Sequence, residues 1–210
     1  MKPGLLTLAQ WLSPAFPVGG FAYSHGLEWA ISVGKIRDSQ SLACWLAAVL
    51  AEGAGRVDAV LLTQALAGGE PAPLAALAEA LAASRERHVE AMEQGAAFLR
   101  TTNALTGADW PAMPLPVAVG VAARGLGVTP QEAAALYLQA FASNLVQVAV
   151  RFVPLGQTAG QAVLAGLQPL ILRLAAEVAT AGLDALGSGA LASDLAAMQH
   201  ETMDVRIFRT

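Results

Sequence analysis

The chain has 210 residues, a net charge of -4, 55% apolar residues and only 13% charged residues. The length suits one domain with a sizeable core, and an acidic chain without a basic stripe argues against a nucleic-acid partner. Its single cysteine, Cys44, cannot form an internal disulfide, which fits a reducing cytosol. Few charges remain to solvate the surface, so we expect large buried areas, some of them between chains.

Helical patterns fill the first half of the chain. The sequence predicts a short helix over 5–12, ended by Ser13-Pro14, and a second over 22–33, ended by Gly34. Asp38 is a typical N-cap for a third helix, which Gly53 and Gly55 break. Further helices are expected over 56–66, 74–82 and 84–105, and the charges of the last are expected on a solvated face: Arg85, Glu86, Arg87, Glu90 and Glu93.

The second half continues in the same way, with a short helix expected over 117–126. Thr129-Pro130-Gln131-Glu132 is a strong start signal, because Thr129 can cap the helix while Glu132 reaches back to its amide. The helix that it opens should run to about residue 152, and others are expected over 158–179 and 191–203. No alternating strand pattern occurs, so we predict one all-α domain, a bundle of eight to ten helices.

Membrane and export signals are weak. The apolar stretches 133–150 and 162–176 are interrupted by polar residues, so we expect neither to span a membrane. No small-residue cleavage site follows Lys2, and we therefore expect no signal peptide and a cytoplasmic protein.

The motifs that would indicate catalysis are incomplete. Gly34-Lys35 lacks the rest of a phosphate-binding loop, and His200-Glu201 begins a zinc-protease motif whose fifth residue is Asp204. His25 and Glu28, three residues apart on the expected second helix, are too few ligands for a tight metal site. The sequence therefore favours a binding protein over an enzyme, with no catalytic residue, no metal site and no cofactor of its own.

Three segments have unusual composition. The first, residues 12–28, combines stiff prolines, permissive glycines and aromatic side chains. In the second, residues 143–161, a polar stripe on an apolar helix is followed by Pro154-Leu155-Gly156. The third, residues 200–210, ends the chain in alternating arginine and large apolar residues, which indicates a segment that docks on another surface.

These segments resemble the signatures of one family, urease accessory protein F (UreF). The N-terminal signature is similar to residues 12–21 running into 23–28, and the middle one to Ser143-Asn144, Arg151, 154–157 and Gly160-Gln161. The C-terminal signature is similar to 200–202 and 206–209, and Arg85-Glu86 and Gln94-Gly95 also fit. The matches run in order over almost the whole chain.

The resemblance implies an all-α adaptor that is not an enzyme. Such proteins dimerise, bind the accessory protein UreD (UreH in some organisms) and recruit the GTPase UreG to apo-urease, where the nickel centre is assembled. The implied organisation is a UreF-like domain over 1–200 and a docking tail over 201–210. Nucleic-acid and membrane partners are not expected.

We name three expected protein-binding surfaces from this resemblance. The N-terminal surface comprises Pro14, Phe16, Pro17, Gly19, Gly20, Phe21, Tyr23, His25 and Glu28. The middle patch comprises Ser143, Asn144, Gln147, Arg151, Pro154, Gly156 and Gln157. The tail surface comprises His200, Glu201, Arg206, Ile207, Phe208 and Arg209; its arginines are expected to pair with acidic groups, and Ile207 and Phe208 to fill pockets, when UreD binds.

Two alternatives stay open at this stage. The chain would act as a GTPase-activating regulator of UreG if Arg85, Arg151 or Arg206 served as an arginine finger. It would act as a direct nickel-binding metallochaperone if His25, Glu28 and His200 bound the ion. Arginine-dependent hydrolysis by UreG and stoichiometric nickel binding distinguish these alternatives from the adaptor.

Overall fold

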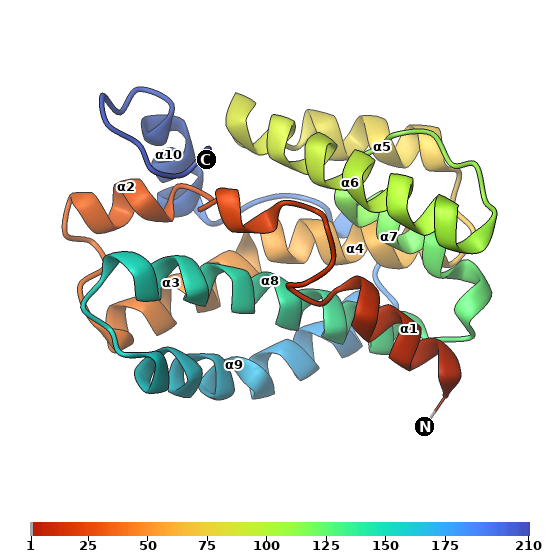
Figure 1. Ribbon diagram of the computed structural model, residues 1–210, viewed down its shortest axis with the longest axis horizontal. Coiled ribbons are helices and arrows are strands. Elements are labelled where there is room, and N and C mark those ends of the chain that lie inside the picture. Colours follow the sequence, from red (N-terminus) through yellow and green to blue (C-terminus); the bar gives the residue numbers. More distant parts are fainter. Residues whose placement is uncertain (1) are drawn as a thin grey trace.

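The structure, a computed structural model, describes residues 2–210, which form ten α-helices, three short 3-10 helices and no strand (Figure 1). The prediction of an all-α bundle of eight to ten helices is confirmed. The α-helices are α1 (Pro3–Trp11), α2 (Leu27–Ser32), α3 (Ser39–Glu52), α4 (Ala54–Leu66), α5 (Pro71–Ala80), α6 (Arg85–Thr106), α7 (Leu115–Ala123), α8 (Pro130–Phe152), α9 (Gln157–Val178) and α10 (Leu191–His200). The 3-10 helices are η1 (Gly20–Ala22), η2 (Arg124–Leu126) and η3 (Leu183–Ala185).

Two helix starts form as local sequence predicts. The Ser41 backbone N–H donates to the Asp38 carboxylate at 2.8 Å, and the Ser41 side chain receives the Asp38 N–H at 3.2 Å. The same reciprocal arrangement joins Thr129 and Glu132 at the start of α8. Each pair satisfies backbone N–H groups that the first turn leaves without a helical partner, which is why these boundaries are readable from sequence.

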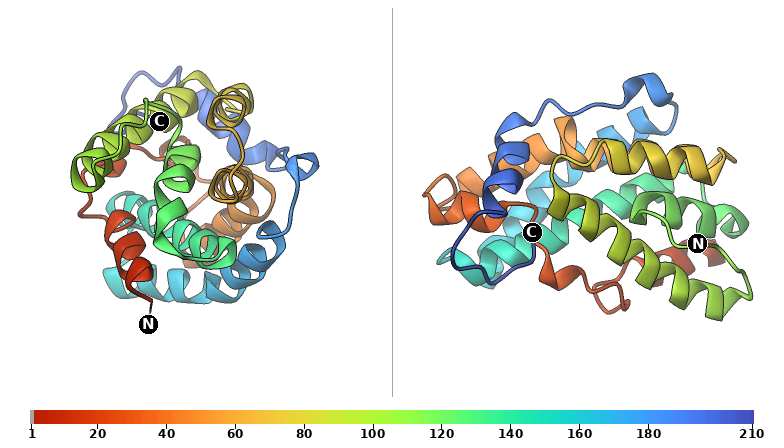
Figure 2. Two further views of the ribbon diagram at one scale, coloured as in Figure 1. Left: turned by 90° about the vertical axis from the view of Figure 1, so that its right-hand side faces the viewer. Right: turned by 90° about the horizontal axis from the view of Figure 1, so that it is seen from above.

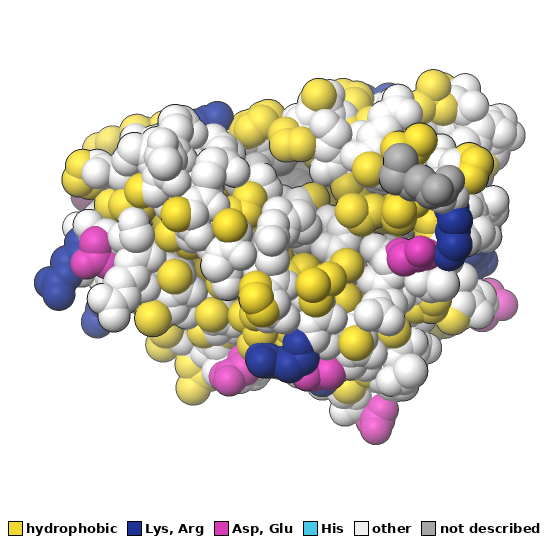
Figure 3. All heavy atoms as spheres, turned by 90° about the horizontal axis from the view of Figure 1, so that it is seen from below, with side chains coloured by type: hydrophobic (Ala, Val, Ile, Leu, Met, Phe, Trp, Pro, Cys, Tyr) yellow, Lys and Arg dark blue, Asp and Glu magenta, His cyan; other side chains and the backbone are white. Residues whose placement is uncertain are grey.

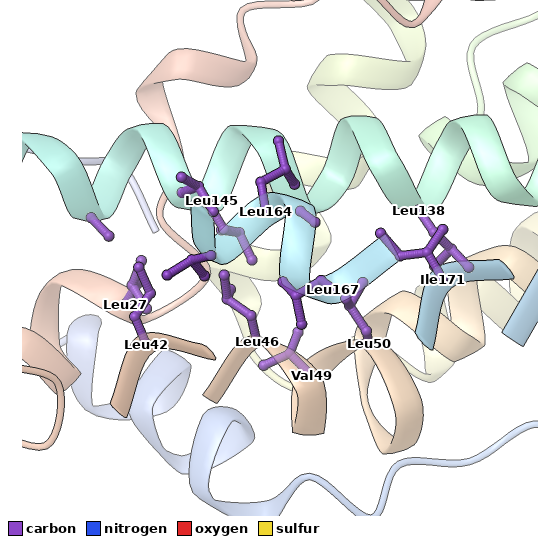
Figure 4. Close-up of a cluster of buried hydrophobic side chains, with 14 of the residues drawn as sticks. Leu27, Leu42, Leu46, Val49, Leu50, Leu138, Leu145, Leu164, Leu167 and Ile171 are labelled. Carbon is purple, nitrogen blue, oxygen red and sulfur yellow. The ribbon is translucent and has the colours of Figure 1, made fainter. Parts of the chain in front are cut away.

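The core forms two adjoining clusters with α8 between them. One packs α8 and α9 on α3, and Leu46, Leu145 and Leu164 meet at its centre (Figure 4). The other packs α1, α4, α6 and α7, and it includes Tyr137 of α8. Figure 2 shows that α9 and α6 lie on opposite sides of the molecule, with α8 alongside α9. Helix α8 therefore contributes buried side chains to both clusters.

Helices α8 and α9 are long and apolar enough to cross a membrane by length and composition, which is more than we expected from their sequences. In the fold, half of the apolar window of α8 and 39% of that of α9 are buried within the protein. Figure 3, a view from below, shows hydrophobic side chains interspersed with other groups and few charges on that face. Both helices thus serve as core helices of the bundle.

Several predicted boundaries were wrong. The chain does not enter a helix at residue 22: α2 begins at Leu27, after η1 and an irregular stretch in which His25 and Gly26 have φ values of 55° and 73°. The backbone N–H groups of Ser24 and His25 donate to Thr210 at the end of the chain and are therefore not available to a helix. Because His25 lies outside α2, His25 and Glu28 do not share one helix, contrary to the sequence-based expectation.

Smaller differences have local reasons. Gly55 lies inside α4 and does not end a helix, because it is packed against Leu50 of α3. Pro71 starts α5, where its missing N–H leaves no helical bond unmade. Helix α10 ends at His200, three residues earlier than predicted, where the His200 side chain is held by carboxylates of two other helices.

Gly95 marks a close approach between α6 and the segment that enters α7. A Cβ atom there would lie 1.9 Å from the Met113 carbonyl oxygen, and backbone cannot yield as a flexible side chain can. We expect Gly95→Ala to lower the free energy of unfolding by about 3 kcal/mol. Gly166→Ala, in an open part of α9, should raise it by about 0.5 kcal/mol. Urea denaturation measures the change in the free energy of unfolding for both variants. Equal changes would contradict a close approach at Gly95.

Candidate protein-binding site

The N-terminal surface is built on the loop between α1 and α2. Phe16 is buried, and its ring packs on that of Phe98 in α6, with centroids 5.6 Å apart. Gly19 has a φ of 74°, a left-handed conformation that glycine adopts without strain, and it leads into η1. Phe21 remains 44% exposed. The loop is thus anchored inside at Phe16 and presents Phe21 outside.

The middle patch contacts this loop through two residues of α8. The Asn144 side-chain amide donates to the Gly20 carbonyl oxygen at 3.0 Å. The Arg151 guanidinium lies over the Phe21 ring, 5.4 Å from its centroid. Ser143 and Gln147 line a cavity that the loop also lines. The other members of the patch, Pro154, Gly156 and Gln157, are exposed at the α8–α9 turn and take no part in these contacts.

The tail contacts the same loop from the other side. It lies beside α2 and the first turns of α6 (Figure 1). The Arg209 N–H donates to the Ala22 carbonyl oxygen at 2.7 Å, and the Ser24 N–H donates to the Thr210 carbonyl oxygen at 2.9 Å. The three expected surfaces, distant in sequence, therefore meet around residues 20–28.

Glu28 is the main anchor of the tail. Its buried carboxylate accepts the backbone N–H groups of Ile207 and Phe208 at 2.8 and 2.9 Å. The same carboxylate lies 3.1 Å from Nε2 of the fully buried His200, whose Nδ1 lies 2.7 Å from Glu86. Glu86 also pairs with Arg206 at 2.5 Å. Helices α2, α6 and α10 and the tail are thus joined through one histidine and two carboxylates.

A second contact of the tail is made by Arg209. It pairs with Glu93 of α6, and its guanidinium lies 5.4 Å from the centroid of the Tyr23 ring. The Tyr23 hydroxyl donates to Glu93. Burial, together with this carboxylate, raises the pKa of Tyr23 well above its usual range, so the phenol stays protonated. The arginines of the tail therefore pair with acidic groups of their own chain.

The apolar residues of the tail differ in their burial. Phe208 is buried and packs on Phe152 of α8, with ring centroids 5.5 Å apart. Ile207 and Val205, in contrast, are 73% and 79% exposed, so Ile207 fills no pocket of this chain. Three residues of one α10 face, Leu191, Leu195 and Met198, are exposed as well. The tail is docked on its own chain and still leaves apolar side chains exposed.

Beneath the loop lies a buried ionic cluster that the sequence analysis missed. Glu90 of α6 accepts hydrogen bonds from Gln94 at 3.0 Å and from the Thr210 hydroxyl at 2.9 Å. It also lies 2.5 Å from Arg87 and 2.8 Å from His25. Burial alone would raise the pKa of Glu90, but the Arg87 charge and the hydrogen bonds outweigh it and lower the pKa to about 2. Glu90 is therefore a buried, fully ionised anchor.

The expected solvated face of α6 was thus wrong for Arg87 and Glu90, although Arg85 and Glu93 are exposed. A signal was present in the sequence: Arg87, Glu90 and Gln94 follow the spacing of one helix face. No partner for these charges is visible locally, so the sequence alone indicates a solvated stripe. The partners come from residues 25, 58, 137 and 210.

Asp58 of α4 belongs to the same cluster, and the effect of its ionisation on stability can be tested. The Tyr137 hydroxyl donates to its carboxylate at 2.8 Å, and burial raises the pKa of Asp58 from 3.8 to about 6. A raised carboxylate pKa disfavours the charged form in the folded state, so stability is lost as the pH rises from about 4 through 6.

We therefore expect Asp58→Asn, which cannot ionise, to raise the free energy of unfolding at pH 8 by up to about 3 kcal/mol. The gain should shrink toward zero near pH 4, where Asp58 is protonated in both states. Denaturant titrations at the two pH values measure the difference, and a gain that does not depend on pH would rule out this cause.

The structure also shows where the residues lie that an arginine finger or a nickel site would use. Arg151 and Arg206 are engaged by Phe21 and Glu86, whereas Arg85 is exposed at the start of α6. His25 is directed to Glu90, and Glu28 to His200. Among residues 2–210, no group of three or more His, Cys, Asp or Glu is placed to hold a metal ion.

Comparison with known proteins gives a consistent result. The family model described as UreF matches residues 36–168. The chain is 64% identical over 210 residues to the urease accessory protein UreF of Cereibacter sphaeroides, covering all of both chains. It is 55% identical to the protein of that name from Dinoroseobacter shibae, covering 98% of both. For that of Mesorhizobium japonicum the identity is 48%, covering 98% of this chain and 96% of the relative. The chain therefore belongs to the UreF family of urease accessory proteins.

Proposed function

We propose that this chain is a cytoplasmic, non-enzymatic adaptor in nickel delivery to urease. In this role it forms a homodimer, binds UreD and recruits the GTPase UreG to apo-urease. The observation that carries the proposal is the meeting of the N-terminal surface, the middle patch and the tail around residues 20–28. These contacts join the three segments into one unit, which suits a protein that binds other proteins.

The apolar groups beside this surface support a protein partner. Val205 and Ile207 of the tail are mostly exposed, and α10 adds Leu191, Leu195 and Met198 on one face. Large exposed apolar side chains that cluster in this way are typical of binding surfaces. We assign this tail and α10 face to UreD. For the homodimer we assign α9, which leaves Leu172 60% exposed.

The assignment to UreD is tested by removing apolar area without adding charge. In the double variant Val205→Ser/Ile207→Ser, binding to tagged UreD should weaken at least about tenfold. Leu105→Ser is the matched control, because Leu105 is 61% exposed at the far end of α6 from Glu86. Surface plasmon resonance gives the dissociation constants. Equal constants for the double variant, the control and the original chain would refute this assignment.

A further inference from the structure

A cavity of about 100 Å³ lies where the loop, α6 and α8 meet. Its walls are largely aromatic and aliphatic, and they include Phe141 and Tyr137 of α8 together with Trp11 and Phe98. Exposed residues among the lining, Pro14 and Phe21, mark its mouth, beside Ser143 and Gln147. The cavity is somewhat smaller than an engineered cavity of about 150 Å³ that binds benzene in another protein. Its size and walls suit a single aromatic ring.

His25 is one of the polar residues that line this cavity. Its side chain is only 10% exposed, and its ring meets Phe141 edge-on with centroids 4.7 Å apart. Burial and the neighbouring Arg87 charge lower the pKa of His25, so the ring is neutral and carries one N–H. Glu90, which can only accept, lies 2.8 Å from Nε2, and the Arg87 guanidinium, which can only donate, lies 2.9 Å from the same atom. Nε2 therefore has protein partners, and Nδ1 is the ring nitrogen left for another group.

The Nδ1 atom is buried, and no group among residues 2–210 lies within hydrogen-bonding distance of it. Buried polar atoms without a partner are rare in native proteins, and they indicate either a solvent molecule or a ligand. The φ of 55° at His25 is also uncommon for a residue with a side chain. The chain thus holds a buried ring nitrogen without a partner at an aromatic cavity.

We propose that the cavity binds an aromatic ring with one hydroxyl group, and that a tyrosine side chain of a partner protein supplies it. The ring would lie among the aromatic walls while its hydroxyl, which can donate or accept, forms a hydrogen bond with Nδ1 of His25. The lining comes from two of the expected protein-binding surfaces, with Gly20 and Phe21 on one side and Ser143 and Asn144 on the other. An aromatic anchor in a pocket within a polar rim is the usual centre of a protein interface.

The pocket chemistry is tested without any partner by using p-cresol, which has the shape of a tyrosine side chain. Its matched probe is p-xylene, in which a methyl group replaces the hydroxyl. Saturation-transfer NMR should show p-cresol bound to the full chain, and p-xylene should bind about fivefold more weakly or less. Equal binding of the two compounds would overturn the hydrogen bond to His25. No binding of p-cresol would overturn the site and assign Nδ1 to solvent.

The position of the site is tested by filling the cavity from α8. Ala140 lines it, so Ala140→Leu should abolish p-cresol binding, whereas Ala76→Leu on the exposed face of α5 should leave it unchanged. Circular dichroism and urea denaturation show whether each variant is folded. If Ala140→Leu does not fold, Ser143→Leu is used to fill the same cavity. Unchanged p-cresol binding in a folded, filled variant would place the compound elsewhere and overturn the proposal.

The assignment of the ring to a partner's tyrosine rests on the proposed adaptor function. Copurification with the partners tests it separately from p-cresol binding. Ala140→Leu should fail to copurify with tagged UreD or UreG, whereas Ala76→Leu should copurify normally. If p-cresol binds as expected but Ala140→Leu still copurifies with both, neither partner inserts the ring, and the tyrosine assignment is overturned. If even the unmodified chain binds neither partner, the adaptor function fails while the p-cresol result stands.

Discussion

Replacing Glu90 with glutamine should lower the free energy of unfolding at pH 7 by about 3–5 kcal/mol. Glutamine keeps the shape of the side chain but removes the charge that compensates the buried Arg87. It also replaces an acceptor with an amide donor that faces His25, Gln94 or Thr210. A loss of this size is a large share of the stability of a typical domain, so the variant should be marginally folded.

The same carboxylate makes a distinct prediction about pH. The pKa of Glu90 is lowered from 4.5 to about 2 in the folded state. A depressed carboxylate pKa contributes stability that is present above pH 4.5 and is lost as the pH falls toward 2. The original chain should therefore lose stability over this range more steeply than Glu90→Gln does. Chemical denaturation between pH 7 and pH 3 shows this, and parallel profiles for the two proteins would contradict a charged anchor.

Removing the Glu28 side chain should release the tail. Glu28→Ala deletes the acceptor of the Ile207 and Phe208 amides and leaves His200 buried beside an empty position. We expect hydrogen exchange at residues 207 and 208 to accelerate at least about a hundredfold, since their protection then falls by about 3 kcal/mol. The global free energy of unfolding should fall by about 3 kcal/mol as well, because His200 loses a charged partner.

Two controls separate tail release from general unfolding. Glu93→Ala removes an exposed carboxylate that pairs with Arg209, so it should change exchange at 207 and 208 by less than about tenfold. Exchange in the middle of α8, around Leu138 and Leu145, should stay slow in Glu28→Ala. If 207 and 208 remained protected in that variant, the tail would not be held through Glu28.

The fold was largely accessible from the sequence because its signals are local. Helix starts at Asp38 and Thr129 depend on groups three residues apart, and the apolar periodicity of α3 and α8 places their buried faces. The irregular stretch before Leu27 was missed for the opposite reason. Its backbone donors are taken by Thr210, which is 186 residues away from Ser24.

The candidate site was accessible in part. The unusual composition around residues 12–28, 143–157 and 200–210 indicated three surfaces, but not that they form one. Their contacts, such as Asn144 to Gly20 and Glu28 to Phe208, join positions that no periodic pattern connects. Local patterns predict a solvated face for the ionic cluster, because two groups that bind Glu90, His25 and Thr210, lie far from it along the chain. Sequence patterns give the chemistry of such groups more readily than their burial.

The most direct test of the adaptor is copurification. We would co-express the chain with UreD and UreG from the same organism, purify through a tag on UreD, and measure the mass of the complex by light scattering. The adaptor predicts a complex that contains two copies of this chain with both partners. It also predicts that a chain ending at His200, which lacks the tail, is lost from the complex. If the full chain fails to copurify with UreD, the central claim is wrong.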